Sequence, residues 1–184
     1  MVTTTPTTPT TPTAPAPAAD ARRARDVAER VPDPELPMLT LADLGVLRDV
    51  RVEEDGTVTA DLTPTYSGCP AMAEMRAGVA ARLLSAGYPR VRVRTVLDPP
   101  WTTDWITAEG RRKLAEHGIA PPGPSPRPAS GPVPLVLSTT RRAVPCPRCG
   151  SADTEETSRF GATSCKALWR CLACREPFEY VKEI

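Results

Sequence analysis

Histidine is almost missing from this sequence of 184 residues, because His117 is the only one. A metal site built on two histidines is therefore excluded. The glycine-rich phosphate loop and the dinucleotide fingerprint are also missing, which excludes the enzyme classes that those loops define. His117 follows a predicted helix, where a solvated role near the helix C-terminus is the ordinary interpretation, and a Ser–His–Asp set is the alternative.

A strong charge of one sign is absent as well. Lys and Arg together number 23 and Asp and Glu 22, a net charge of +1, so the composition favours neither a nucleic-acid partner nor an anionic membrane. No apolar run reaches the roughly 18 residues that a membrane-spanning helix needs. The first residues show neither the basic segment nor the apolar stretch of a secretory signal. We therefore expect a cytoplasmic protein, in which cysteines serve metal binding or reactivity before disulfides.

Proline is abundant but unevenly placed. Of 23 prolines, five lie in residues 3–17 and seven in residues 121–134. A stretch of alternating Thr and Pro cannot bury enough apolar surface to order itself, and the second stretch is typical of a semi-stiff spacer. The sequence thus predicts four segments: a disordered Thr/Pro tail (1–19), a folded domain (20–119), a Pro-rich linker (120–144) and a cysteine-rich module (145–184).

The larger domain is predicted to be α+β, with one small three-stranded mixed sheet and helices. Asp55-Gly56 is a strong hairpin signal between two alternating strands. Gly87 is typical of a residue that ends a helix. The expected elements are, in order, a helix at Asp20–Val31, strands at Val46–Glu53 and Thr57–Thr63, a helix at Ala71–Ala86, a strand at Val91–Leu97 and a helix at Thr107–His117.

The loop that contains Cys69 joins the second strand to the second helix. Pro70 suits the first position of a helix, which would place Cys69 at the N-cap. The helix dipole and the free N–H groups there favour a thiolate. Without a neighbouring histidine base, such a thiolate suits persulfide chemistry or transient iron binding better than hydrolysis. The alternative interpretation is a small apolar residue that fills the junction between strand and helix.

Two Cys-x-x-Cys pairs in the last segment form the strongest spacing signal of the chain. Cys146 and Cys149 make one pair and Cys171 and Cys174 the other, with 21 residues between the pairs. Each pair supplies two thiolates to a tetrahedral metal site, and short strands at 154–160 and 168–171 would bring the pairs together. So short a module is expected to need the metal in order to fold. The sequence therefore predicts a four-cysteine, zinc-ribbon-like module.

Cys165 and the identity of the metal are left open by the spacing. Cys165 could replace a member of the second pair, be a spare thiol beside the metal, or be an inert buried residue. Zinc is the default occupant of four thiolates, and iron uses the same ligands.

Several short motifs resemble known families. Asp33-Pro34-Glu35, Asp43-Leu44-Gly45 and the stretch from Thr65 to Pro70 resemble the small domain of SufT-type iron–sulfur assembly factors. Residues 99–106 and 160–180 resemble the PaaD subunit of phenylacetyl-CoA epoxidase clusters. The resemblance implies an iron–sulfur-assembly-like fold for the first domain.

By this resemblance, Cys69 is the reactive cysteine, and Asp33, Glu35, Asp43 and Thr65 are motif positions around it. Asp33 and Asp43 have the alternative role of capping turns or helices. The resemblance implies an accessory or maturation factor for the di-iron epoxidase in phenylacetate catabolism, not an enzyme itself. Its partners would be epoxidase subunits or iron–sulfur assembly proteins. Besides the structural zinc, the protein would transiently bind iron or an iron–sulfur cluster. The competing hypothesis is an electron-transfer subunit with an iron-loaded four-cysteine centre.

Overall fold

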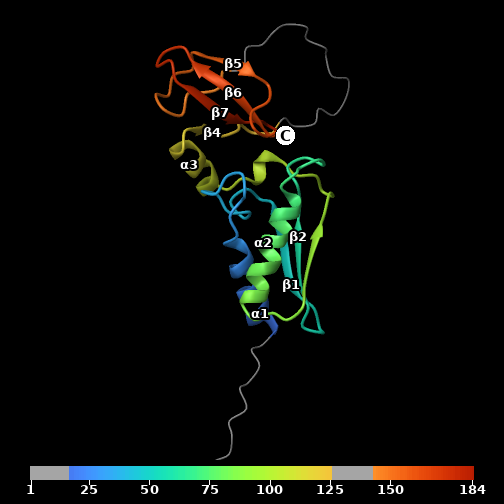
Figure 1. The fold of residues 1–184 in the computed structure, drawn as a ribbon. Helices are drawn as coiled ribbons and strands as arrows, with labels where there is room; N and C mark the ends of the chain where they lie inside the picture. The colour runs from blue at the N-terminus through green and yellow to red at the C-terminus, as the bar shows by residue number, and fades with distance from the viewer. Residues whose placement is uncertain (1–16, 126–142) are drawn as a thin grey trace, which may run out of the picture.

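The computed structural model describes residues 17–125 and 143–184 of the chain. Most of the predicted tail (1–19) and of the predicted linker (120–144) lies outside these ranges. The described residues form two modules, a first module and a ribbon module, and the ribbon module lies above the first module in Figure 1. The elements of the first module are α1 (Pro17–Glu29), β1 (Leu47–Val52), β2 (Val58–Leu62), α2 (Met72–Ser85), β3 (Val91–Thr95), the 3-10 turn η1 (Thr103–Trp105) and α3 (Ala108–Glu116).

The first module contains the predicted three-stranded mixed sheet. Its strand order is β1-β2-β3, with β1 antiparallel and β3 parallel to the central strand. The hairpin turn adopts the expected geometry, since Gly56 has a φ of +80° and the Asp55 carboxylate accepts a hydrogen bond from the Thr57 N–H. The α+β prediction with a mixed sheet is confirmed, and the observed bounds differ from the predicted ones by at most three residues.

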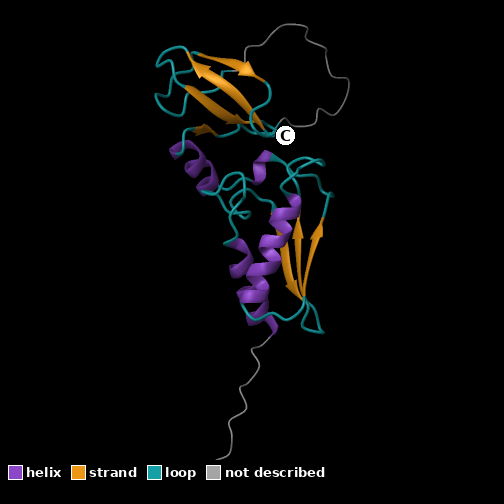
Figure 2. Ribbon diagram, viewed as in Figure 1, coloured by secondary structure: helices purple, strands orange, loops and turns teal. Residues whose placement is uncertain are grey.

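Helices α1 and α2 lie along one side of this sheet, as Figure 2 shows. Small residues of α1, such as Ala24 and Ala28, and larger ones of α2, such as Val79 and Leu83, are fully buried in one apolar core with β2. The alternation in β2 predicts that only one face of the sheet is buried. Instead, all five residues of β2 are buried, because Arg51 and Arg94 lie over Asp61 on the opposite face.

Gly45 holds the segment before β1 close to the loop that follows β3. It has a φ of +68°, and a Cβ atom there would lie 2.6 Å from the Trp105 Cβ. The neighbouring Leu44 carbonyl accepts a hydrogen bond of 2.9 Å from the indole of Trp101. This close packing fixes one wall of the junction at which the two modules meet.

The ribbon module is a four-stranded sheet in the order β4-β7-β6-β5. Its strands are β4 (Ile119–Ala120), β5 (Thr154–Ser158), β6 (Lys166–Cys171) and β7 (Pro177–Val181). The sequence predicts β5 and most of β6 but neither β4 nor β7. Trp169, Phe178 and Tyr180 are the large side chains of its small core, and they pack with Cys146 and Cys171.

The two modules contact each other directly. Strand β4 follows α3 after a turn of two residues and pairs in parallel with β7, so the end of the first module forms an edge of the ribbon sheet. Ile119 and Val181 are buried in the core of the first module, whereas Ala120 belongs to the core of the ribbon. The Thr103 N–H also donates to the Ile184 carbonyl. The ribbon is thus fixed against the first module and not only tethered to it.

Candidate metal centre and thiol pocket

The four predicted ribbon cysteines lie together at one end of the ribbon sheet. Cys146 and Cys149 flank a tight turn that Gly150 closes with a φ of +75°. Cys171 ends β6, and Cys174 lies in the matching turn before β7. In that second turn the left-handed position is taken by Arg175, with a φ of +67°. Two turns of similar shape thus present two thiols each to a common point.

The spacing of these four thiols, which we call the four-cysteine centre, fits a metal ion. Four sulfur atoms at about 2.3 Å from a tetrahedral zinc are about 3.8 Å from one another. The Cys146 and Cys174 Sγ atoms are 3.8 Å apart, the Cys149 and Cys171 Sγ atoms are 3.6 Å apart, and all four lie within 4.8 Å of one another. The Cys174 N–H donates to the Cys171 Sγ, and this bond is the main cause that lowers the pKa of Cys171 to about 7. Of the two thiols in this turn, Cys171 is therefore the one that ionises first, while the pKa of Cys174 is raised.

Cys165 does not belong to the four-cysteine centre. It lies in the turn that precedes β6, where the Thr163 hydroxyl is 3.1 Å from its Sγ. The N–H of Lys182, the residue after β7, donates to the Cys165 carbonyl and so fixes the backbone of this turn. The structure therefore argues against Cys165 as a replacement for Cys171 or Cys174.

Cys165 and Cys69 line the same cavity, which lies between the two modules and has a volume of about 40 Å³. A bound water needs roughly 10–15 Å³ on this measure, so there is room for an ion with a few waters. We call this cavity the thiol pocket. Its polar lining comes from Asp33, Glu35, Thr65, Cys69, Cys165 and Lys182. Trp101, Ile106 and Val181 are among the apolar lining residues.

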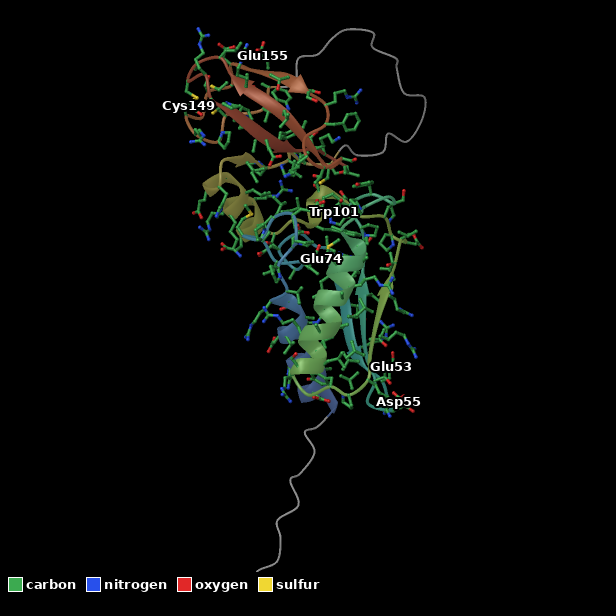
Figure 3. The ribbon with its side chains drawn as sticks, viewed as in Figure 1. Glu53, Asp55, Glu74, Trp101, Cys149 and Glu155 are labelled. Atoms are coloured by element: carbon green, nitrogen blue, oxygen red, sulfur yellow. The ribbon has the colours of Figure 1, made fainter. Side chains whose placement is uncertain are left out.

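The thiol pocket and the four-cysteine centre are separate places. Figure 3 shows Cys149 at an end of the ribbon and Trp101, from the pocket lining, at the junction of the two modules. Among the residues that the structure describes, the four ribbon cysteines are the one group of three or more metal-ligating side chains with all ligand atoms within 4.8 Å. One centre is thus compact and the other open.

The prediction that Cys69 is the N-cap of the second helix is wrong. Helix α2 begins at Met72, its N-cap is Ala71, and Cys69 lies in the turn before it. The Ala71 N–H does donate to the thiol, but burial outweighs this bond and raises the pKa of Cys69. The nearby Glu35 carboxylate raises this pKa further. In the free protein Cys69 is therefore a protonated, half-buried thiol and not the activated thiolate that the helix dipole predicts.

Two of the predicted acidic residues line the thiol pocket. The Asp33 Oδ1 accepts hydrogen bonds from the Glu35 and Leu36 N–H groups, at 2.9 and 2.8 Å. Asp33 therefore has the turn-capping role that the sequence left open, while it also faces the pocket. Burial raises the pKa of both Asp33 and Glu35, and for Glu35 the adjacent Asp33 adds to the increase.

Asp43 and His117 lie elsewhere. The Asp43 carboxylate accepts hydrogen bonds from the Thr40 N–H and the Lys113 ammonium, which holds α3 against the loop before β1. Desolvation acts against these bonds, but together they lower the pKa of Asp43. Asp43 therefore has the capping role that the sequence analysis gave as its alternative. Neither Asp43 nor His117 lines the thiol pocket. His117 is exposed at the end of α3, with its Nδ1 at 2.8 Å from the Lys113 carbonyl.

Sequence reasoning did not place Cys165 near Cys69. The spacing of the cysteines relates Cys165 only to the other ribbon cysteines, and no local sequence pattern indicates a contact between Cys165 and the first module.

The described helices include none that is long and apolar enough to cross a membrane.

Two family models match the chain, one for each module. A model described as "Iron-sulfur cluster assembly protein" matches residues 24–97, a range that includes Asp33, Glu35 and Cys69. A model described as "PaaD zinc beta ribbon domain" matches residues 130–182, which include Cys165 and the four-cysteine centre.

The chain is also similar to individual proteins. Over 80 residues, 42% of this chain, it is 35% identical to the Fe-S protein maturation auxiliary factor SufT of Staphylococcus aureus, of which it covers 88%. A crystal structure of a DUF59 domain from Bacillus anthracis matches 53% of this chain and 92% of that chain, with 27% identity and a TM-score of 0.48.

A longer match includes both modules. Over 153 residues the chain is 44% identical to a protein of Escherichia coli that is named as a putative subunit of the 1,2-phenylacetyl-CoA epoxidase. Such relatives are named as a subunit or as auxiliary factors, in line with the expectation of an accessory protein. Because the match covers 83% of this chain and 87% of that protein, the chain belongs to the PaaD family, the family of this epoxidase component.

Proposed function

We propose that this protein is an accessory factor that supports maturation of a di-iron phenylacetyl-CoA epoxidase by handling iron or sulfur at Cys69. The relatives support this role, since one is named as a subunit of such an epoxidase and others as iron–sulfur maturation factors. The observation that carries the proposal is the presence of two separate sulfur sites. One has four thiols at metal-binding distances, and the other is an open pocket around Cys69.

The four-cysteine centre would hold zinc and serve as architecture. Zinc bound by four thiolates keeps no open coordination position, so it stabilises a fold and does not activate a substrate. Here it would fix β6 and β7, and through them the turn of Cys165 and the apolar contact of Val181 with the first module. The ribbon would then present a rigid surface to a partner protein, such as another epoxidase component.

Cys69 would act as the carrier. Its thiol is half-buried beside two carboxylates, and burial keeps it protonated while the pocket is free. A cation lowers the pKa of a thiol that it binds, so loading and deprotonation would occur together. A protonated thiol also reacts slowly with oxidants, which would protect the carrier between deliveries.

The test is rescue of epoxidase activity in a strain that lacks this protein. We expect Cys69→Ser to retain its fold and its zinc but to rescue less than a tenth of the activity that the parent restores. Ser67→Ala, an exposed change in the same loop, is the matched control and should rescue fully. Full rescue by Cys69→Ser would remove the thiol from the function.

The same preparations separate the electron-transfer hypothesis from this proposal. An iron-loaded four-cysteine centre would be coloured and would show a reversible redox couple. A colourless, zinc-containing protein without such a couple would remove that hypothesis.

A further inference from the structure

The thiol pocket joins two thiols from different modules. Cys69 comes from the loop before α2, and Cys165 comes from the turn before β6 of the ribbon. Both are free thiols and both are partly buried. Their positions depend on the docking of the ribbon, since Val181 packs into the first core and the Lys182 N–H fixes the Cys165 carbonyl.

The pocket combines these thiols with unneutralised carboxylates. In the described part of the chain, no basic side chain forms an ion pair with Asp33 or Glu35. The nearby Lys166 pairs with Glu179 at 2.9 Å, outside the pocket lining. Lys182 lines the pocket, but its ammonium donates to the Arg159 carbonyl and lies over the Phe160 ring. Lys166 still attracts both carboxylates from this position, but its ion pair is with Glu179.

We propose that Cys69, Cys165 and Glu35 together bind one ferrous ion between the two modules. This inference rests on the proposed function and names the second thiol of the carrier site. Two thiolates and a carboxylate suit a borderline cation such as Fe²⁺. Asp33 would be a positioning residue, because its Oδ1 holds the backbone N–H of Glu35.

The surrounding charges favour a cation over a persulfide. A persulfide or sulfide is anionic and would be repelled by Asp33 and Glu35, whereas a divalent ion would neutralise them. The chemistry of loading is balanced without an oxidant. Each thiol releases one proton as its sulfur binds the ion, so one Fe²⁺ displaces two protons and no oxidation state changes.

The open geometry suits a carrier. Unlike the four-cysteine centre, the groups of the pocket do not lie within 4.8 Å of one another, so side chains must close around the ion. Closure costs free energy, which makes binding weaker and release easier than at a preformed site. Because the ligands come from both modules, the ion would also strengthen the docking of the ribbon.

Cobalt(II) is the probe for the test, because thiolate–cobalt bonds absorb in the near ultraviolet. Cobalt ranks below zinc in affinity, so it leaves a zinc-filled four-cysteine centre intact. The full chain, purified without oxygen and with one zinc per chain, should bind one Co²⁺ and release two protons. Cys165→Ser should weaken this binding at least tenfold and halve the absorption per cobalt, and Ser164→Ala, its exposed neighbour, should change neither.

Each outcome has a distinct meaning. If Cys165→Ser binds cobalt with the affinity and the absorption of the parent, the inference is wrong. If Cys69→Ser alone abolishes binding in that case, the proposed function stands with a different second ligand. If the parent binds no cobalt beyond the zinc site, the inference is wrong, and the rescue assay still decides whether Cys69 has a function.

Discussion

The raised pKa of Cys69 makes a specific prediction about its reactivity. An unperturbed cysteine thiol has a pKa of 9.0, and both burial and the Glu35 carboxylate raise the pKa of Cys69 above it. At pH 7 the ionised fraction of this thiol is then smaller than that of an unperturbed cysteine. Because the thiolate is the reacting form, Cys69 should be alkylated more slowly than a small exposed thiol such as glutathione.

Replacement of Glu35 by Gln should increase this reactivity. The change removes one negative charge beside the thiol, so the pKa of Cys69 falls and the thiolate fraction at pH 7 rises. Tenfold in rate corresponds to one pKa unit, and for a partly exposed carboxylate we expect an increase of roughly two- to tenfold. Iodoacetamide labelling of the metal-free pocket, followed by peptide mass spectrometry, resolves Cys69 from the other cysteines.

The matched control is Glu54→Gln, an exposed change of the same charge in the hairpin of the first module. It should leave the labelling rate of Cys69 unchanged. Equal rates in the two variants, or a parent Cys69 that reacts faster than glutathione at pH 7, would refute the assignment of a buried, protonated thiol.

Three further predictions concern the architecture. Cys146→Ser should lose the zinc and the near-ultraviolet circular dichroism of the ribbon, whereas Cys165→Ser should retain its zinc; equal zinc contents would contradict the ligand assignment. Asp61, whose pKa the Arg94 hydrogen bonds lower to about 2, stabilises the fold above pH 3.8 and loses this contribution as the pH falls towards 2. Asp61→Asn should therefore lower the free energy of unfolding by about 1–2 kcal/mol at pH 7, a value reduced because solvent screens the exposed Arg51 and Arg94 partners. At pH 2 the same change should have almost no effect, and denaturant titrations at the two pH values would measure the difference. Gly45→Ala should lower the melting temperature more than Gly87→Ala, because both sites have a positive φ but only the first meets a neighbour at 2.6 Å.

Local sequence patterns were sufficient to predict most of the secondary structure of the first module. Alternation, the Asp55-Gly56 turn and Gly87 act over a few residues, so the sequence alone predicts the strands, the helices and the mixed sheet. The two Cys-x-x-Cys pairs could also be predicted from local sequence, because each short turn presents its own two thiols. Only the contact between the two turns depends on residues far apart in the sequence. The structure brings all four within 4.8 Å.

The thiol pocket could not be predicted in this way. Cys165 reaches it only because β7 pairs with both β4 and β6 and thereby fixes the ribbon against the first module. These strand pairings join segments that are far apart in the sequence, and no periodic pattern of residues in the sequence indicates them. The error at Cys69 has the same origin, since the helix-dipole argument assumes a solvated terminus, whereas burial raises its pKa.

The most direct test of the two separate sulfur sites is elemental analysis of protein purified without oxygen from iron-replete cells. The parent should contain one zinc per chain together with iron, and Cys69→Ser should keep the zinc and lose the iron. If Cys69→Ser keeps the iron, or if it loses zinc along with iron, the division between an architectural centre and a carrier pocket is wrong.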